Sequence, residues 1–349
     1  MSHRYTGVGW TRQKKRYDGI VLAFALLYVT AFASITLATQ ASVTAETVVI
    51  RASGTLAFLM LTLALLIGPL ARLDSRFLPL LYNRRHLGVT TFLVALVHGL
   101  FSLVQFHSQG VLHPVVSVLV GDGSFVGNGP LPFQPFGVAA LVVLSLMAAT
   151  SHDFWLATLG PPLWKALHMG VYPAYAALLA HVGFGALQSE GRMILWPALG
   201  AAALAVFGTH VVAGFKEAPV DRPLPLVERQ GRVRLVAADR IPEGRALTVR
   251  LGGERVAVFR NGDQISCVSN VCRHQMGPLG EGQIVDGCIT CPWHGYQYDP
   301  VTGCSPPPYT ERIETWNVVI EDGYVWADPE PNPLGTPARV ATHRLDGEG

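Results

Sequence analysis

The stretch "CRHQMGPLGEGQIVDGCITCPWHGYQYD", from Cys272 to Asp299, contains a Cys-x-His motif and a Cys-x-x-His motif with sixteen residues between them. Two thiols and two imidazoles in such short motifs are a typical set of metal ligands. A structural zinc site is one interpretation, because two Cys and two His can complete a tetrahedron around zinc. Zinc motifs, however, usually pair Cys with Cys and His with His, whereas each motif here is mixed. A 2Fe-2S cluster in which two thiolates hold one iron and two imidazoles hold the other explains the mixture.

Residues 230–329 resemble a Rieske domain, and the segments CRH and CPWHG resemble its two cluster-binding loops. The resemblance implies that Cys272 and Cys291 hold an inner iron. It implies that His274 and His294 hold an outer and more exposed iron. A 2Fe-2S cluster of the Rieske type is therefore the expected cofactor, with these four residues as its ligands.

At four positions around the two loops, this chain can be compared with the quinol-oxidising branch of that family. Gly277 and Trp293 stand where that branch has two disulfide-forming cysteines. Tyr296 replaces a serine that donates a hydrogen bond to a sulfide, whereas Tyr298 matches the other donor. Fewer donors leave the reduced cluster less stabilised. We therefore expect a potential in the lower part of the Rieske range of about −150 to +300 mV.

Three further cysteines, Cys267, Cys288 and Cys304, could be disulfide partners, additional ligands or small hydrophobic side chains. We expect buried thiols, because cysteine outside disulfides is among the most buried residue types. Five cysteines in 349 residues do not describe a disulfide scaffold. A domain rich in thiols instead indicates a reducing compartment.

Hydrophobic residues make up 50% of the chain and charged residues only 14%, and residues 19–215 hold most of the apolar side chains. Runs of about 20 residues with few charges are typical of membrane helices. Six such runs occur, at about 19–40, 52–71, 86–106, 134–151, 164–187 and 194–215. The predicted fold is an α-helical membrane bundle of six spans (residues 19–215) followed by an all-β Rieske domain.

The segments after the last span complete the domain organisation. Residues 216–229, KEAPVDRPLPLVER, are proline-rich and charged, and so predict a short semi-rigid linker. Within residues 230–329, four Gly-containing dipeptides separate short β-prone runs, which indicates antiparallel hairpins. These dipeptides are Gly252-Gly253, Asn261-Gly262, Asp286-Gly287 and Asp322-Gly323. Residues 330–349, rich in Pro and Gly, are expected to be a disordered tail.

Basic residues predict the orientation in the membrane, because positively charged loops stay in the cytoplasm. Only Arg51 and Arg192 lie on one predicted side. The other side holds Arg4, Arg12, Lys14, Lys15, Arg16, Arg72, Arg76, Arg84, Arg85 and Lys165. We therefore expect a multi-pass protein of the inner (cytoplasmic) membrane, with a cytoplasmic basic N-terminus (residues 1–18) and a cytoplasmic Rieske domain. The net charge of +2 gives no indication of a nucleic-acid partner.

Four of the twelve histidines fall within predicted spans and away from the span ends: His98, His168, His181 and His210. An imidazole in hydrocarbon needs a partner. A single histidine in a membrane helix is more often a hydrogen-bond donor between helices than a ligand, and we interpret His210 in that way.

The other three lie in RRHLGVTTFLVALVHGLF and LGPPLWKALHMGVYPAYAALLAH, which resemble the third and fifth spans of the ferric-reductase-like transmembrane family. The resemblance covers roughly residues 50–215. It implies b-type heme held by histidines of these two spans.

Depth in the membrane decides which histidines can bind one heme, because a helix rises about 1.5 Å per residue. His98 is thirteen residues past Arg85, roughly 20 Å from the cytoplasmic edge. His181 is sixteen residues past Lys165, roughly 24 Å from that edge. These two are therefore predicted to be the axial ligands of one heme. His168, three residues past Lys165, is a candidate for a second heme, although on one ideal helix it lies about 140° around from His181.

These features predict a membrane electron-transfer protein that passes single electrons between a cytoplasmic Rieske cluster and one or two transmembrane b-type hemes. It would be an oxidoreductase component whose donor and acceptor are open: the quinone pool, a soluble reductase and a periplasmic protein all fit. One alternative is a membrane-tethered Rieske ferredoxin that serves a partner enzyme, with the helical domain only an anchor. A second is a self-contained Rieske oxygenase, but it needs a mononuclear iron site of two histidines and a carboxylate, for which we expect no room.

Overall fold

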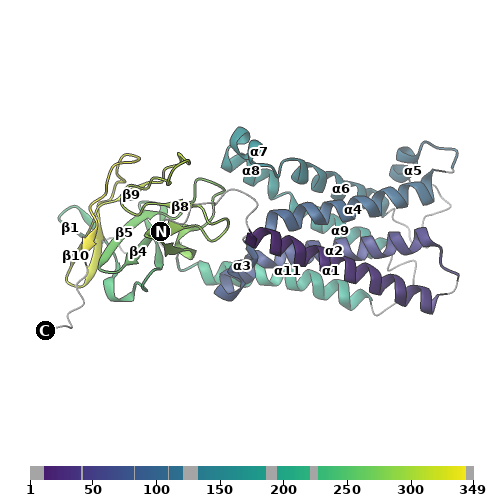
Figure 1. Cartoon of the computed structure of the whole chain (residues 1–349), viewed down its shortest axis with the longest axis horizontal. Coiled ribbons are helices and arrows are strands. Elements are labelled where there is room, and N and C mark those ends of the chain that lie inside the picture. Colours follow the sequence, from purple (N-terminus) through teal and green to yellow (C-terminus); the bar gives the residue numbers. More distant parts are fainter. Residues whose placement is uncertain are drawn as a thin grey trace. The chain divides into compact units, whose positions relative to one another are not determined.

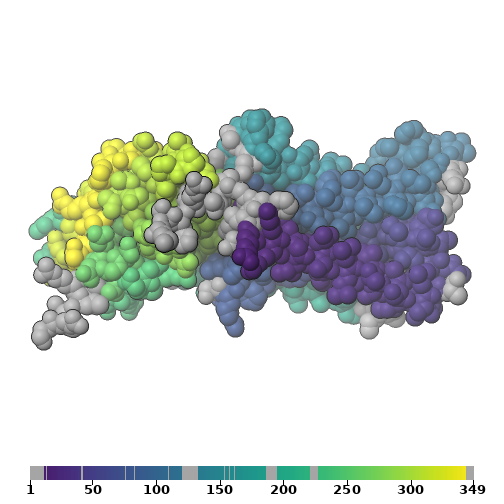
Figure 2. Space-filling model, in the orientation of Figure 1, coloured from purple at the N-terminus to yellow at the C-terminus, as the bar shows by residue number. Residues whose placement is uncertain are grey.

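The computed structural model of the chain describes residues 12–40, 42–81, 83–108, 110–120, 133–185, 195–220 and 227–342. The chain divides into two compact units: a helical unit of residues 12–72 and 83–212, and a second unit that holds residues 73–81 and 213–342. Figure 1 labels the elements and Figure 2 gives the same chain in space-filling form. Several predicted features lie outside the described residues, namely Arg4, Arg192, residues 221–226 of the linker and residues 343–349 of the tail.

Four helices are long and apolar enough to cross a membrane, by length and composition. They are α1 (Arg12–Thr39), α2 (Ala45–Leu73), α4 (Arg84–His107) and α11 (Leu195–Glu217). The fourth expected span, residues 134–151, corresponds to α6 (Gln134–Ala149), a shorter apolar helix of 16 residues. The predicted number of six spans is therefore not confirmed for the described residues.

The fifth expected span, residues 164–187, is not one helix. Helix α8 (Pro161–His168) ends at His168, and α9 (Val171–Phe184) begins after a two-residue turn. Pro173 in the first turn of α9 has no backbone N–H to donate to the carbonyl of Met169, and its ring crowds that carbonyl. The helix is consequently interrupted, so the 140° estimate for His168 and His181, which assumes one ideal helix, does not apply.

The helical unit exposes large apolar side chains on its outer surface. Examples are Leu27 of α1 at 71% exposure, Val104 of α4 at 64% and Leu204 of α11 at 74%. Surfaces of this kind suit lipid rather than water, because apolar patches this extensive are uncommon on soluble monomers. The remaining short helices of the described chain are η1 (Ser75–Phe77), α3 (Leu78–Leu81), α5 (Pro114–Val120) and α7 (Asp153–Leu159).

The interior of the helical unit centres on Tyr175 of α9, which is fully buried. Its ring packs in a core with Leu61 and Leu65 of α2 and Leu144 of α6. The Tyr175 hydroxyl is 3.1 Å from Oγ1 of Thr62, so its polar atom is satisfied inside the bundle. Helices α2, α6 and α9 are thereby fixed against one another, and α4 packs on α6.

Residues 227–342 of the second unit form an all-β domain, the β unit, of three antiparallel sheets, which confirms the predicted fold class. The first sheet has the order β1 (Glu228–Arg229), β2 (Arg232–Ala237), β11 (Tyr324–Ala327), β10 (Val318–Glu321). The second has the order β12 (Ala341–Thr342), β5 (Gln264–Ser269), β4 (Glu254–Asn261), β3 (Ala246–Leu251), with β9 (Thr315–Trp316) also on β5. The third has the order β6 (Gln283–Val285), β7 (Cys288–Thr290), β8 (Gln297–Tyr298). Two 3-10 turns, η2 (Ala238–Arg240) and η3 (Leu279–Glu281), connect strands.

The predicted hairpin turns are confirmed at three of four dipeptides. Asp286-Gly287 joins β6 to β7 and Asp322-Gly323 joins β10 to β11. Both residues of each turn have positive φ, 51° and 78° in the first and 53° and 76° in the second, as type I′ turns require. Gly252-Gly253 joins β3 to β4 in the same way. The β4–β5 turn is Gly262-Asp263, one residue later than predicted, because Asn261 still pairs within β4.

The expectation of a disordered tail was wrong for residues 330–342. Ala341 and Thr342 form β12, which pairs with β5. Asn332 donates its backbone N–H to the Thr315 carbonyl at 2.8 Å, and Ala338 donates to the Val301 carbonyl at 2.8 Å. Composition suggested disorder because Pro and Gly are frequent here, but the backbone groups find partners on the edge of the second sheet.

Candidate functional site

The two predicted ligand motifs form loops of equal length in the β unit. Loop 1 (residues 272–277) is closed by the bridge between Val271 and Pro278, and loop 2 (residues 291–296) by the pairing of Thr290 with Gln297. In each loop the leading Cys N–H donates to the carbonyl five residues later, at 2.9 Å in loop 1 and 2.7 Å in loop 2. In each loop the carbonyl of that Cys accepts an N–H from four residues later. The two motifs are therefore presented by the same backbone geometry.

The fifth residue of each loop has a left-handed backbone. Gly295 has φ +70° in loop 2, and Met276 has φ +57° in loop 1. Glycine adopts this conformation without penalty, whereas a residue with a side chain is strained by about 1 kcal/mol or more. Loop 1 thus holds a strained residue two positions after a predicted iron ligand, where the loop geometry requires it.

The two predicted thiol ligands are buried next to each other. Cys272 is 1% exposed and Cys291 is 2% exposed. Burial raises the pKa of the Cys272 thiol, but hydrogen bonds with Cys291, with Tyr298 and with the backbone N–H groups after it more than offset burial, so its pKa lies below the usual range. Burial and the neighbouring Cys272 raise the pKa of Cys291 well above its usual range. One thiolate is stabilised at the pair, and thiolates are the form that binds metal.

Tyr298 contributes a directed hydrogen bond to this pair. Its hydroxyl accepts the N–H of Arg273 at 3.0 Å and lies 3.4 Å from Sγ of Cys272. Because the hydroxyl oxygen is already an acceptor, its proton is available to the sulfur. Burial, followed by the charge of Cys272, raises the pKa of Tyr298 far above its usual value, so this proton stays on the oxygen.

The two predicted imidazole ligands also form a pair. The ring centres of His274 and His294 are 5.1 Å apart and their planes are nearly perpendicular. Both rings are half-buried, and the Nδ1 atom of each is buried. Two imidazoles bound at about 2 Å to one tetrahedral metal place their ring centres about 5 Å apart. The donor set therefore fits a cluster with buried thiolates on one iron and more exposed imidazoles on the other.

The substituted positions around the loops are filled by aromatic contacts. A Cβ built on Gly277 would lie 2.9 Å from Sγ of Cys291 and 3.1 Å from the Trp293 ring, so Trp293 packs where a loop 1 side chain would stand. Tyr296 stacks on His274, with ring centres 4.9 Å apart, and its hydroxyl donates to the carboxylate of Glu311. Its hydroxyl is thus directed at a carboxylate rather than at sulfur.

The other cysteines differ in burial. Cys267 is buried, as predicted, whereas Cys288 and Cys304 are only half-buried, so the prediction was wrong for those two. All five cysteines of the described residues are thiols without a disulfide. No group of three or more His, Cys, Asp or Glu side chains that could hold a single metal ion occurs in the described parts of the chain. The predicted ligands are arranged by type in two pairs.

In the helical unit, the structure brings two of the predicted heme ligands together. His98 lies on α4 and His181 on α9, and their ring centres are 6.2 Å apart with an interplanar angle of 82°. Nδ1 of His98 is 2.9 Å from the Ile50 carbonyl, and Nδ1 of His181 is 3.1 Å from the Phe133 carbonyl. A carbonyl only accepts, so both Nδ1 atoms carry the proton and Nε2 is left as the basic nitrogen.

The geometry of this imidazole pair fits axial ligation of one metal. Two imidazoles on opposite sides of a metal, each bonded at about 2 Å, place their ring centres about 6 Å apart. A hydrogen bond from the second ring nitrogen to a carbonyl is the usual support of a metal-bound histidine. Sequence reasoning missed the residues that supply these carbonyls, Ile50 and Phe133, because a backbone carbonyl carries no side-chain signal.

The remaining membrane histidines have different surroundings. His210 uses both nitrogens, Nδ1 toward the Val206 carbonyl at 2.8 Å and Nε2 toward the Tyr172 hydroxyl at 2.9 Å, so it is a hydrogen-bonded histidine between helices, as predicted. His168 stacks on Trp164 with ring centres 3.8 Å apart. Its Nδ1 is 3.0 Å from the Trp164 carbonyl, and its Nε2 is buried without a hydrogen-bond partner among the described residues.

His86 is a further histidine near the start of α4. Its Nδ1 is 2.8 Å from Oδ2 of Asp18 on α1, so this imidazole is held by a carboxylate.

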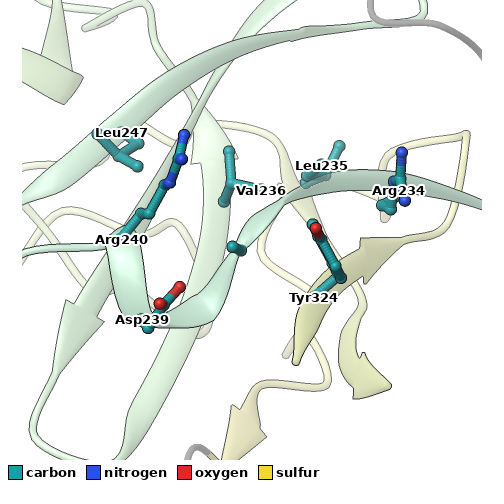
Figure 3. Close-up of a pocket in the computed structure, with 8 residues that line it drawn as sticks. Arg234, Leu235, Val236, Asp239, Arg240, Leu247 and Tyr324 are labelled. Carbon is teal, nitrogen blue, oxygen red and sulfur yellow. The ribbon is translucent and has the colours of Figure 1, made fainter. Parts of the chain in front are cut away.

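A separate pocket lies on the β unit, lined by residues of β2, η2, β3 and β11 (Figure 3). Arg234 lies over the ring of Tyr324, with its guanidinium carbon 4.8 Å from the ring centre, and Asp239 and Arg240 lie on the adjoining turn. None of the eight lining residues belongs to loop 1 or loop 2. The pocket is thus distinct from the predicted cluster site.

Comparison with known proteins supports both parts of the chain. Residues 231–317 match the Rieske 2Fe-2S domain family, and residues 53–179 match the ferric reductase like transmembrane component family. The anthranilate 1,2-dioxygenase ferredoxin subunit of Burkholderia cepacia is 35% identical over 92 residues, which are 26% of this chain and 85% of that protein. Both resemblances inferred from the sequence are confirmed.

Longer relatives are matched only in part. The oxygenase component of 3-ketosteroid-9-alpha-monooxygenase of Rhodococcus rhodochrous is 30% identical over 114 residues, which are 30% of this chain and 28% of that protein. Among solved structures, the ferredoxin of carbazole 1,9a-dioxygenase from Nocardioides aromaticivorans IC177 has 26% identity and a TM-score of 0.28, and the match covers 29% of this chain and 100% of the ferredoxin. The chain spans less than a third of the length of the monooxygenase component.

The two family matches and the ferredoxin relative define a Rieske iron–sulfur protein with a membrane region. The chain belongs to the Rieske 2Fe-2S family, and joins its Rieske domain to a ferric reductase like transmembrane component. This combination suggests electron transfer at a membrane.

Proposed function

We propose that the chain passes single electrons between a Rieske 2Fe-2S cluster and b-type heme. The cluster ligands are Cys272, Cys291, His274 and His294, and the axial heme ligands are His98 and His181. Both groups supply one-electron redox chemistry when bound. The chain contributes the ligands, their hydrogen bonds and the burial that tunes the potentials.

The observation that carries the heme proposal is the His98–His181 pair. Two imidazoles from α4 and α9 lie with ring centres 6.2 Å apart, and each has its Nδ1 fixed on a backbone carbonyl. A structural histidine in a bundle usually uses its ring to bond another helix, as His210 does through Nε2 to Tyr172 of α9, while its Nδ1 bonds Val206 within α11. In the pair, by contrast, neither Nε2 atom makes a hydrogen bond within the described residues. Iron ligation requires this nitrogen to be available.

We assign His168 to a second heme or to an electron route toward the first. Its ring stacks on Trp164, and the guanidinium of Arg85 lies 5.9 Å from the centre of the same indole. A basic and aromatic environment of this kind suits an anionic, planar ligand.

The basic residues support a cytoplasmic position for the N-terminus and the Rieske domain, in a multi-pass protein of the inner membrane. Arg72 is in the last turn of α2, and Arg84 and Arg85 begin α4, so these cations flank the connection that holds η1 and α3 between two apolar helices. Turns with such charge stay on the cytoplasmic side. The donor and acceptor are then a soluble reductase, the quinone pool or a periplasmic protein.

A second candidate function is a membrane-tethered Rieske ferredoxin. It is favoured by the match to a dioxygenase ferredoxin subunit over 85% of that protein. In that case the helical unit is an anchor, and the Rieske domain serves a partner oxygenase.

Single substitutions distinguish these functions. We expect Cys272→Ser to abolish the Rieske electron-paramagnetic resonance signal and to leave heme in place. His181→Ala should remove the b-type absorption spectrum and leave the Rieske signal. His210→Ala is the matched control, because it removes a membrane imidazole outside the pair and should retain both signals. A wild-type protein with a full cluster and no heme would support the ferredoxin and exclude the heme proposal.

A further inference from the structure

Each imidazole of the His98–His181 pair is backed by a glycine of a neighbouring helix. A Cβ built on Gly54 of α2 would lie 2.7 Å from Nδ1 of His98, and a Cβ built on Gly137 of α6 would lie 2.7 Å from Nδ1 of His181. Side-chain carbons essentially never approach other atoms this closely. No residue except glycine fits at either position unless the imidazole moves.

The two glycines occupy the same place relative to the hydrogen bond that the imidazole makes. His98 contacts the carbonyl of Ile50, and Ile50 is four residues before Gly54. In an α-helix this carbonyl is the acceptor of the N–H of residue 54. The ring of His98 therefore crosses over Gly54 to reach the second lone pair of a carbonyl that belongs to the same helical turn.

The arrangement recurs at the other imidazole. His181 contacts the carbonyl of Phe133, four residues before Gly137. Phe133 is the N-cap of α6, and its carbonyl accepts the first hydrogen bond of the helix. Helices α2, α4, α6 and α9, which carry these residues, are labelled in Figure 1. Two different helices thus build the same notch, one glycine and the carbonyl four residues before it.

We infer that Gly54 and Gly137 are positioning residues for the two axial histidines. Each notch holds Nδ1–H on a carbonyl, fixes the tautomer and leaves Nε2 for iron. This inference rests on the proposed heme ligation. It names residues that act through the histidines and do not touch the iron.

Close packing of helices is the alternative reason for a glycine in a membrane bundle, and the chain contains a control for it. A Cβ at Gly99 of α4 would lie 2.9 Å from Cδ2 of Leu141, a close contact between helices that involves no imidazole. Gly88, also on α4, has nothing within 4 Å of such a Cβ. Gly99→Ala therefore tests helix packing alone, and Gly88→Ala tests the change of residue alone.

The predicted effect follows from the loss of a supporting hydrogen bond. A methyl group at either notch displaces the ring from its carbonyl, and loss of such a partner usually weakens metal binding 10- to 100-fold. We expect Gly54→Ala and Gly137→Ala to raise the heme dissociation constant by roughly that factor. The heme that remains should have a higher midpoint potential, because an imidazole without the hydrogen bond donates less electron density to iron.

The experiment uses full-length protein in detergent, with heme transfer to apomyoglobin, a redox titration and electron-paramagnetic resonance of the ferric state. Gly88→Ala and Gly99→Ala should match the wild type in heme retention and potential. An intact Rieske signal shows that the β domain of each variant has folded, and an unchanged far-ultraviolet circular dichroism spectrum shows the same for the helical unit. Equal heme loss in Gly54→Ala, Gly137→Ala and Gly99→Ala would overturn the inference in favour of helix packing, and wild-type behaviour of both notch variants would also overturn it.

A measurement on the unmodified protein covers the case in which a notch variant does not fold. Pulsed electron-paramagnetic resonance of the ferric heme reports the remote imidazole nitrogen, and we expect protonated, hydrogen-bonded Nδ1 on both ligands. Nδ1 without a hydrogen bond would overturn the inference. The two proposals fail separately: a wild type that lacks heme removes the proposed function, whereas a wild type that binds heme through His98 and His181 with tolerant notches removes only this inference.

Discussion

Hydrogen bonds of individual side chains separate the proposed heme ligands from His210. His98 and His181 each bond a backbone carbonyl through Nδ1, whereas His210 bonds through both nitrogens. The distinction matters because a neutral imidazole has one donor and one acceptor nitrogen, and only the acceptor binds metal. The Nε2 atom of His210 is thus occupied, whereas the Nε2 atoms of His98 and His181 have no hydrogen bond within the described residues.

Tyr298 is the residue at which the cluster potential can be tested. Its hydroxyl lies 3.4 Å from Sγ of Cys272, and hydrogen bonds to sulfur stabilise the reduced cluster. We expect Tyr298→Phe to lower the midpoint potential by roughly 60 mV, a tenfold change in a one-electron equilibrium. Redox titration of the Rieske signal measures it.

Tyr296→Phe is the matched control, because the Tyr296 hydroxyl donates to Glu311 and not to sulfur. Its potential should change much less than that of Tyr298→Phe. Equal shifts in the two variants would contradict the assignment of Tyr298 as the sulfur donor.

Candidate ligands could be predicted from sequence and the structure brings them together in pairs, but the groups that support them could not be predicted. Cysteine and histidine spacing identifies Cys272, His274, Cys291 and His294, because only a few metal groups need mixed motifs. Helix rise was enough to predict that His98 and His181 lie at one depth, and the structure brings their rings together. Gly54 and the carbonyl of Ile50 were not predictable, since their role depends on which helix faces His98 and on its rotation.

At the scale of elements, short-range turn chemistry was more predictive than hydropathy. Asp286-Gly287 and Asp322-Gly323 predict their hairpins because few residues adopt two successive positive φ angles. The interruption between α8 and α9 was missed, because a hydropathy window over residues 164–187 counts Pro173 among apolar neighbours and ignores its missing N–H. The ordered segment 330–342 was missed because Pro- and Gly-rich composition does not report an available sheet edge.

That C-terminal segment provides a test at the scale of elements. The segment forms β12, which pairs with β5. In addition, the Arg339 carbonyl accepts the N–H of Val318, and the N–H of Asn332 donates to the Thr315 carbonyl. Each hydrogen bond contributes roughly 0.5–1.5 kcal/mol to stability, so loss of the segment should lower the free energy of unfolding by about 3 kcal/mol. We expect a truncated chain of residues 1–329 to lose its Rieske visible circular dichroism at a temperature roughly 10–20 °C lower than the full chain does.

The control for this truncation is a chain that ends at Thr342, which keeps every one of these hydrogen bonds. It should melt as the full chain does. A chain ending at Pro329 with an unchanged melting temperature would show that the segment contributes nothing to the stability of the domain.

At the scale of the whole molecule, a Rieske domain and a ferric reductase like membrane region share one chain. The uneven distribution of apolar residues predicts this division, because a soluble β domain and a lipid-facing bundle differ in composition. The number of spans was less predictable, since α6 has 16 residues and α9 has 14, and both are shorter than a typical span. Our account of the molecule is that both regions carry a redox group.

The most direct measurement is the stoichiometry of heme, non-heme iron and acid-labile sulfide in one purified sample of the full chain. The account predicts two non-heme irons, two sulfides and at least one b-type heme per chain. Two hemes would support the assignment of His168 to a second heme, and one would assign it to the electron route. A sample with two irons and two sulfides but no heme, after growth with sufficient heme supply, would contradict the central claim that the helical unit is a redox domain.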